Sequence, residues 1–308
     1  MHFFHKFIVL LTLLANARLD DIDPTPVPVK AKATVSLGEP RLFSGEPLQI
    51  TCSVPDDLLS NWRYQWFRNG VLLSSTKVYS LEKAQVQQSG NYICQGEKSI
   101  PDWPYIVSSI PSDPLKVDVD GGWALLRTPL EPLIIEETTN LTCRVRNGLI
   151  PSNVIFYKDE VEIKKQTGKN LVFPRLMLED NGSYSCRATW FKNRQFQSAH
   201  SLPSSLTVLD KLDPPRLEFY RGQRLVLTGK EVVFKCITKV NAREQGLNVE
   251  YHYTKDDNRL GPASAKSTYV IPQVNKDDTG IYACKVRVRA LNVEKWSNTL
   301  QLKVWSLK

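Results

Sequence analysis

Residues 180–186 read Asp-Asn-Gly-Ser-Tyr-Ser-Cys, and two similar stretches occur elsewhere in the chain. They are Gln-Ser-Gly-Asn-Tyr-Ile-Cys at residues 88–94 and Asp-Thr-Gly-Ile-Tyr-Ala-Cys at residues 278–284. Each stretch joins a glycine turn to a Tyr-x-Cys triplet, and another cysteine stands 42, 43 or 48 residues before the cysteine of the triplet. The 308-residue chain therefore contains one unit three times, and its six cysteines fall into three pairs.

The spacing of the three units is typical of immunoglobulin sandwiches. The second cysteines recur 92 and 98 residues apart, close to the roughly 100 residues of one such domain. The tyrosine before each of them stands where its hydroxyl can form the tyrosine corner of this fold. Because Gln88 replaces the aspartate of the other two units, we expect the first corner to be held less firmly. We predict an all-β fold of three tandem C2- or I-type immunoglobulin-like domains, each with one intradomain disulfide: Cys52–Cys94, Cys143–Cys186 and Cys236–Cys284.

Alternating apolar residues predict the strand that carries the first cysteine of each pair, at residues 48–52, 140–143 and 232–236. The next strand should supply the aromatic side chain that packs on the disulfide. In the first domain this residue is Trp66, and in the second Phe156 takes its place. In the third domain the sequence leaves Tyr251 and Tyr253 as alternatives.

Residues 1–17 have the pattern of a signal peptide: basic residues, an apolar run at 7–14 and small residues at 15–17. A membrane anchor is the alternative, but a span needs about 20 apolar residues. Export favours disulfides over metal-bound or nucleophilic cysteines. We expect an extended lead-in at 18–30 and domains at 31–118, 119–210 and 211–308. No later stretch reaches spanning length, so we expect a secreted, extracellular protein, although a piece of a membrane receptor would look the same.

The sequence offers little for catalysis. Beyond the signal peptide only His200 and His252 remain as histidines, and neither has metal-ligand or Cys/His spacing. No glycine-rich phosphate loop and no G-x-S-x-G motif occurs. We therefore expect a protein that is not an enzyme and that needs no metal and no cofactor.

Two N-glycosylation motifs begin at Asn140 and Asn181. Asn181 is the preferred acceptor because it lies in the predicted turn before the Tyr-x-Cys triplet. Asn140 lies on a predicted strand, between inward-facing positions.

Positive charge is concentrated at the C-terminal end. The chain has a net charge of +8, and residues 211–308 hold 18 lysines and arginines against 10 aspartates and glutamates. This excess indicates either a surface for acidic glycans or a charged face that only aids solubility. Nucleic acid is a poor candidate partner for an exported protein.

Aromatic and basic residues predict a partner-binding surface in the second domain, because interfaces favour tryptophan, tyrosine and arginine. Trp123 opens the domain, residues 144–150 form a predicted loop, and residues 190–194 lead into a hairpin. The alternative for Trp123 is packing in the interdomain elbow. The candidate contact residues in these three segments are Trp123, Arg144, Arg146, Leu149, Trp190, Phe191, Lys192 and Arg194.

Residues 122–126 (Gly-Trp-Ala-Leu-Leu) and 154–159 (Val-Ile-Phe-Tyr-Lys-Asp) resemble the second domain of leukocyte Fc receptors and Fc receptor-like proteins. The resemblance implies that this domain binds the Fc region of immunoglobulin heavy chains, with Tyr157 and Lys158 as further contacts. Mammalian members clamp an Fc proline between two tryptophans. Trp123 matches the first and Arg146 stands at the second, which leaves the antibody class open.

Without an anchor the chain resembles soluble three-domain receptors of fish. The leading hypothesis is a secreted Fc receptor that acts as a soluble modulator or decoy. The alternative is an adhesion or glycan-binding ectodomain of a leukocyte immunoglobulin-superfamily receptor.

Overall fold

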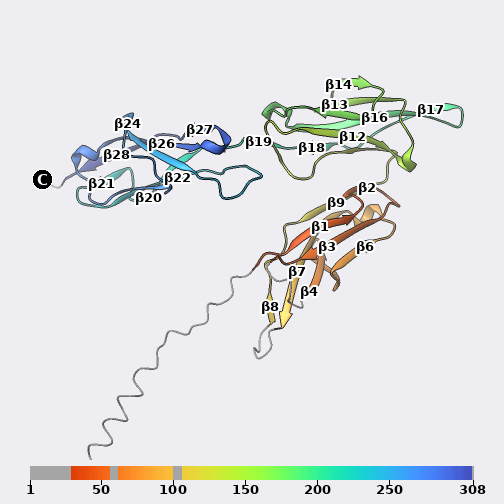
Figure 1. Cartoon of the computed structure of the whole chain (residues 1–308), viewed down its shortest axis with the longest axis horizontal. Helices are drawn as coiled ribbons and strands as arrows, with labels where there is room; N and C mark the ends of the chain where they lie inside the picture. The colour runs from red at the N-terminus through yellow and green to blue at the C-terminus, as the bar shows by residue number, and fades with distance from the viewer. Residues whose placement is uncertain (1–28, 56–61, 100–105, 307–308) are drawn as a thin grey trace, which may run out of the picture. The chain divides into compact units, whose positions relative to one another are not determined.

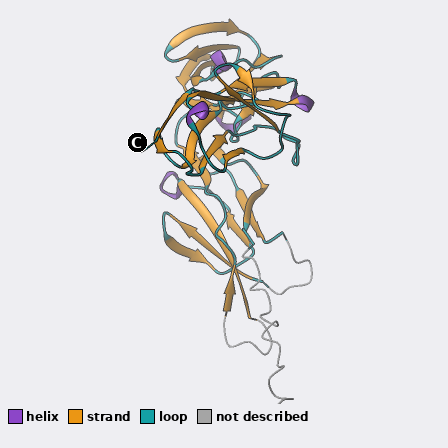
Figure 2. Ribbon diagram, turned by 90° about the vertical axis from the view of Figure 1, so that its left-hand side faces the viewer, coloured by secondary structure: helices purple, strands orange, loops and turns teal. Residues whose placement is uncertain are grey.

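The structure is a computed structural model that describes residues 29–55, 62–99 and 106–306. The predicted signal peptide and nearly all of the predicted lead-in lie outside these residues. Strands make up the regular structure, and the helical segments are single 3₁₀ turns (Figures 1 and 2). Within the described ranges, no helix has the length and apolar character needed to cross a membrane.

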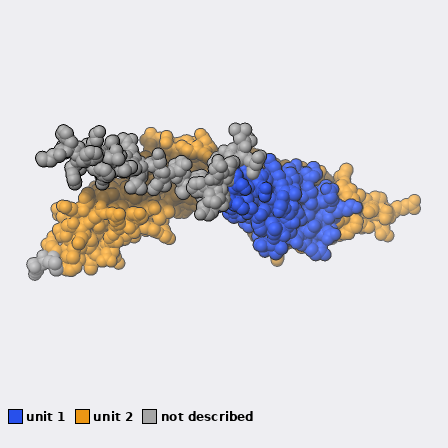
Figure 3. Space-filling model, turned by 90° about the horizontal axis from the view of Figure 1, so that it is seen from below, with its two compact units in different colours: residues 1–121 blue, residues 122–308 orange. Residues whose placement is uncertain are grey.

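The chain divides into two compact units, residues 1–121 and 122–308 (Figure 3). The first unit holds one hydrophobic core and the second unit holds two. Each core surrounds one of the predicted disulfides: Cys52–Cys94, Cys143–Cys186 or Cys236–Cys284. The prediction of an all-β chain with several disulfide-linked sandwiches is confirmed. The exact domain boundaries stay predictions.

In the first domain a three-stranded sheet packs against a larger one. The smaller sheet has the order β1 (Lys32–Leu37), β3 (Leu48–Ser53), β6 (Val78–Leu81). The larger has the order β2 (Arg41–Phe43), β9 (Leu115–Asp120), β7 (Gly90–Ser99), β4 (Arg63–Arg68), β5 (Val71–Ser74), and β8 (Ile106–Ser108) also pairs with β7.

The second domain repeats this plan. One sheet has the order β10 (Ala124–Arg127), β12 (Thr139–Val145), β15 (Asn170–Phe173). The other has the order β14 (Val161–Gln166), β13 (Asn153–Lys158), β16 (Gly182–Lys192), β17 (Gln195–His200), and β18 (Ser204–Leu206) also pairs with β16. A short parallel pair joins β11 (Leu133–Ile134) to β19 (Val208–Leu209).

The third domain has the same two layers. Its smaller sheet is β20 (Arg216–Arg221), β22 (Val232–Ile237), β25 (Thr268–Ile271). The larger is β21 (Leu225–Leu227), β28 (Leu300–Trp305), β26 (Gly280–Val288), β23 (Glu250–Lys255), β24 (Asn258–Arg259), with β27 (Val293–Trp296) on β26. Tyr253 is the buried aromatic of this core and lies opposite Cys284, whereas Tyr251 is only partly buried. The structure thus resolves the alternative that the sequence left open.

All three tyrosine corners are formed. Each hydroxyl donates to a backbone carbonyl four residues earlier: Tyr92 to Gln88 at 2.7 Å, Tyr184 to Asp180 at 2.8 Å and Tyr282 to Asp278 at 2.8 Å. The Gln88 side chain accepts from the Gln85 N–H at 2.8 Å, just as Asp180 and Asp278 accept from the N–H three residues before them. Gln88 therefore makes the same bond as the two aspartates, because an amide oxygen accepts as a carboxylate does, and the geometry gives no sign of a weaker first corner.

Candidate partner-binding surface

A two-residue hairpin closes one end of the second domain. It joins β16 to β17 through Asn193 and Arg194, whose φ angles are 54° and 61°. A turn with two positive φ angles matches the right-handed twist of the flanking strands. The register that follows places Phe191 directly opposite Phe196.

Phe191 and Phe196 form an exposed aromatic pair on this hairpin. Their ring centroids lie 5.2 Å apart at 63°, an edge-to-face arrangement. The two side chains keep 58% and 72% of their surface exposed. Sequence reasoning named Phe191 and missed Phe196. The signal was present, because a two-residue turn at 193 and 194 sets the pairing of these positions.

Trp123 and Trp190 form a second aromatic pair, with one ring buried and the other exposed. The rings stack with centroids 6.0 Å apart and an interplanar angle of 22°. Trp190 is only 2% exposed and belongs to the core, so the prediction that it is an exposed contact residue is wrong. Trp123 keeps 42% of its surface exposed, and the Lys192 ammonium lies 5.3 Å from its ring centroid. Trp190 therefore supports Trp123, and Lys192 covers part of the same ring.

The loop after β12 is tied to the start of the domain. The Arg146 N–H donates to the Trp123 carbonyl at 3.0 Å, and the Arg146 Nε donates to the Gly122 carbonyl at 2.8 Å. Leu149 is partly buried against the core. Ile150, which sequence reasoning left out of the candidate site, is 88% exposed. Arg146 thus fixes the backbone around Trp123, and Ile150 adds apolar surface to the loop.

The structure separates the remaining predicted contact residues from this end. Lys158 pairs with Tyr184 in the register of β13 and β16, and its ammonium donates to the Glu179 carbonyl. Tyr184 precedes Trp190 by six residues on β16, or about 20 Å at the usual rise of a strand. Tyr157 lies in mid-sheet, with its ring 5.7 Å from that of His200.

Arg144 is half-buried on β12, in the opposite sheet. The predicted residues that meet at the hairpin end are Trp123, Arg146, Phe191, Lys192 and Arg194, with Trp190 buried beneath Trp123. We call this the hairpin-end surface, and it includes Phe196 and Ile150.

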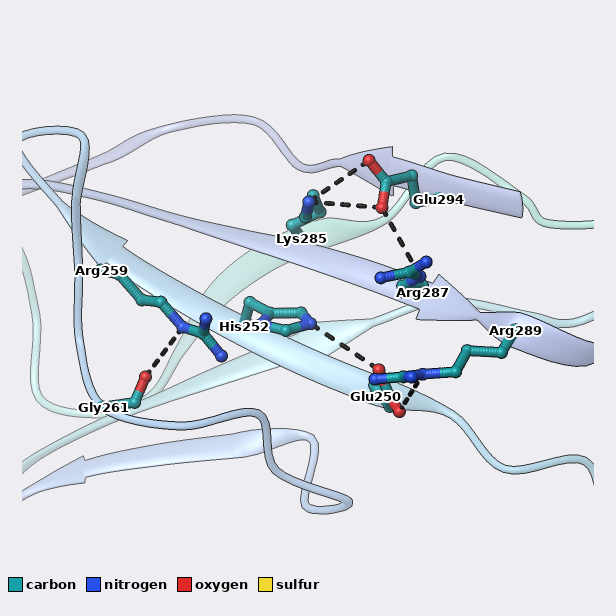
Figure 4. A network of polar contacts seen from close by, with 8 residues as sticks. All are labelled: Glu250, His252, Arg259, Gly261, Lys285, Arg287, Arg289 and Glu294. Carbon is teal, nitrogen blue, oxygen red and sulfur yellow. Dashed lines mark hydrogen bonds and ion pairs between the residues drawn. The ribbon is translucent and has the colours of Figure 1, made fainter. Parts of the chain in front are cut away.

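The basic strand of the third domain lies in a network that also contains carboxylates (Figure 4). Glu294 contacts both Lys285, at 3.3 Å, and Arg287, at 3.8 Å. Glu250 accepts from Arg289 at 2.7 Å, and this hydrogen bond lowers the pKa of the Glu250 carboxyl. The positive charge of this domain is therefore partly balanced by carboxylates, and glycan binding by the domain stays an untested alternative.

His252 lies in the middle of the same network. Its Nε2 is 3.9 Å from Glu250, while Arg259 and Lys285 add positive charge nearby (Figure 4). Burial lowers the pKa of His252 below its ordinary value, and the two cations lower it further. This shift favours the uncharged imidazole at neutral pH. Over residues 29–55, 62–99 and 106–306, no three His, Cys, Asp or Glu side chains gather as a metal site would require.

Comparison with known proteins identifies the family. The family model described as "Immunoglobulin domain" matches residues 30–119 and 126–206, more than half of the chain. Low affinity immunoglobulin gamma Fc region receptor III-A of Mustela putorius furo is 30% identical over 61% of this chain and 70% of its own length. Human Fc receptor-like protein 3 is 22% identical over 90% of this chain, which spans 36% of that protein.

Among solved structures, Drosophila OTK extracellular domains 3–5 cover 91% of this chain at 18% identity and a TM-score of 0.27. The chain spans between about a quarter and less than half of the length of the Fc receptor-like proteins 3 and 5 that it matches. The relatives are receptors, not enzymes, and this chain shares their non-catalytic class. The chain belongs to the immunoglobulin-domain proteins and, among them, to the Fc receptor and Fc receptor-like family.

Proposed function

We propose that the chain is a secreted receptor that binds the Fc region of immunoglobulin through the hairpin-end surface and acts as a soluble modulator or decoy. Membership of the Fc receptor and Fc receptor-like family supports an immunoglobulin partner. The names of two kinds of relatives, gamma Fc region receptors and an epsilon receptor alpha subunit, state such a partner for those proteins. The carrying observation in this chain is Trp123, an exposed ring held flat on the buried Trp190.

A rigid, half-exposed aromatic ring suits a protein contact. It loses little conformational freedom on binding and buries a large area, as interface hot spots do. Phe191 and Phe196 add exposed apolar surface on the opposite face of the same hairpin, because Phe191 alternates with the inward-facing Trp190 along β16. The resemblance to mammalian Fc receptors implies a second tryptophan at the position of Arg146, and in this chain the Arg146 side chain donates to the Gly122 carbonyl. We therefore assign an Fc partner without specifying the antibody class.

The direct test is surface plasmon resonance with the whole chain against immobilised serum immunoglobulin, its Fc fragment and its Fab fragment. We expect binding to Fc and none to Fab. The paired substitution Trp123→Ala and Phe191→Ala should weaken binding about 30-fold or more, since each hot-spot side chain contributes about 1–3 kcal/mol. Val172→Ala is the matched control, because Val172 is 59% exposed on β15 of the opposite sheet.

Two outcomes would contradict the proposal. One is absence of Fc binding at micromolar concentrations. The other is a loss of Fc affinity in Val172→Ala that is as large as the loss in the paired variant. Salt separates Fc binding from glycan binding. The distance over which exposed charges act is about 8 Å at physiological ionic strength and shortens as salt is raised, so glycan binding through surface charges should weaken. An aromatic contact should keep its affinity when salt is raised.

A further inference from the structure

The side chain of Asn181 makes three hydrogen bonds that hold the turn before β16. Its Oδ1 accepts from the Val208 N–H at 2.8 Å. Its Nδ2 donates one hydrogen to the Leu178 carbonyl at 2.8 Å and the other to the Val208 carbonyl at 2.9 Å. An amide has only two such hydrogens. Because Val208 donates to Oδ1, the orientation of the amide is fixed.

The other two domains place a hydroxyl at the same position. Ser89 Oγ accepts from the Val119 N–H at 2.9 Å, and Thr279 Oγ1 accepts from the Val304 N–H at 3.0 Å. In every domain this side chain therefore fastens the turn to the last strand. Asn181 makes the same acceptor contact and adds two donated bonds.

Asn140 differs from Asn181 in its hydrogen bonding, although both residues are exposed. Its side chain is exposed on β12, opposite Val172 on β15. Within the part of the chain that the structure describes, its amide makes no hydrogen bond to protein. Thr142, the third residue of its motif, lies on the same face. A sugar on Asn140 would displace no bond and would lie beside the exposed Val172.

We propose that the second domain carries its N-linked glycan on Asn140, and that Asn181 stays unmodified in the folded protein because it is a structural clamp. The sugar is attached to the side-chain nitrogen, where it replaces one amide hydrogen. At Asn181 this would remove a bond to the Leu178 or Val208 carbonyl and place a bulky group against the backbone. A chain glycosylated at Asn181 loses this hydrogen bond in the folded state and is less stable. The secreted protein therefore contains little of that form.

The glycan on Asn140 leaves the hairpin-end surface uncovered. Asn140 precedes Val145 by five residues on β12, about 17 Å along the strand. Val145 pairs with Ala124, the residue after Trp123. The β16–β17 hairpin belongs to the other sheet of the sandwich, away from β12.

The test is site mapping on the full chain, expressed in a eukaryotic secretory host and purified as monomer from the medium. Peptide N-glycosidase in H₂¹⁸O converts a glycosylated asparagine to labelled aspartate, which peptide mass spectrometry locates. We expect label at Asn140 and none at Asn181. Label at Asn181, or no label at Asn140, overturns the proposal.

Two variants test the reason for the selectivity. Asn140→Gln should lower the protein mass by one glycan and leave the melting temperature unchanged. Asn181→Ala should leave the glycan mass unchanged and lower the melting temperature by about 5 °C or more. Asn181→Thr, which copies Thr279, should melt between Asn181→Ala and the parent. A melting temperature of Asn181→Ala equal to that of the parent protein would overturn the structural role of Asn181.

Discussion

Trp190 lies beneath Trp123, so one tryptophan is a core residue and its neighbour is a surface residue in the same stack. The two rings lie 6.0 Å apart and nearly parallel. Substitution of Trp190 should therefore lower stability, whereas substitution of Trp123 should mainly weaken binding.

Trp190→Ala removes a buried ring and should lower the free energy of unfolding by about 3–5 kcal/mol. Trp123→Ala exposes no core and should cost about 1 kcal/mol or less, mainly the loss of its stacking. Urea unfolding of the isolated variants gives both values. Equal losses for the two variants would contradict this division of roles.

The pH dependence of the third domain should follow His252. Its folded-state pKa is lowered by burial and by Arg259 and Lys285, whereas its pKa in the unfolded chain is about 6.5. The unfolded chain therefore binds the proton more readily, and stability falls as pH drops from 6.5 toward the lower folded-state pKa. One group contributes at most about 1.4 kcal/mol per pH unit.

Thermal melting of the chain between pH 7.5 and 5 would measure this loss. His252→Gln should flatten the dependence between pH 6.5 and 5. An unchanged slope in the His252 variant would exclude the imidazole as the source.

The three tyrosine corners should contribute equally to stability. Each hydroxyl makes one bond to a carbonyl, so Tyr→Phe at residues 92, 184 or 282 should cost about 1 kcal/mol. Burial and the nearby Asp180 raise the pKa of Tyr184 to about 12, so its hydroxyl keeps its proton well into the alkaline range. A clearly smaller cost at Tyr92, measured by denaturant unfolding, would restore the expectation that Gln88 weakens the first corner.

Local sequence patterns predicted much of the fold and part of the candidate site. The cysteine spacing and the Tyr-x-Cys triplets predicted the disulfides and the corners. The same two-residue period shows that Trp190 faces inward, because it lies an even number of positions from Cys186 on one strand. This position on the strand decides the burial of Trp190, whereas the general preference of interfaces for tryptophan led to the wrong prediction. The two-residue turn likewise determined the place of Phe196.

Other contacts depend on strands that meet only in the folded chain. The Cys186 N–H donates to Ser201 Oγ at 3.0 Å, and the Ser201 N–H returns a bond to the Cys186 carbonyl at 2.8 Å. Cys94 with Ser112 and Cys284 with Ser297 repeat this exchange. The serines follow their cysteines at 18, 15 and 13 residues, so no fixed spacing reveals them. The bonds of Asn181 to Val208 arise in the same way.

Arg243 of the third domain should restrain its position against the second. The guanidinium donates from Nε and Nη2 to the two carboxylate oxygens of Glu137, at 2.8 and 2.9 Å, and from Nη2 to the Pro132 carbonyl at 3.1 Å. These bonds lower the pKa of Glu137. Because both side chains are partly exposed, the ion pair should be worth about 1 kcal/mol or less.

Such a small energy can still narrow the distribution of domain orientations. Small-angle scattering of residues 122–308 should show a broader ensemble for Arg243→Ala than for the parent, and 0.5 M salt should broaden the parent in the same direction. Arg221→Ala is the matched control, since Arg221 pairs with Glu231 at 2.9 Å within the third domain. Because that control removes the same charge without touching the contact, an equal broadening in both variants would assign the effect to net charge and not to the Arg243–Glu137 pair.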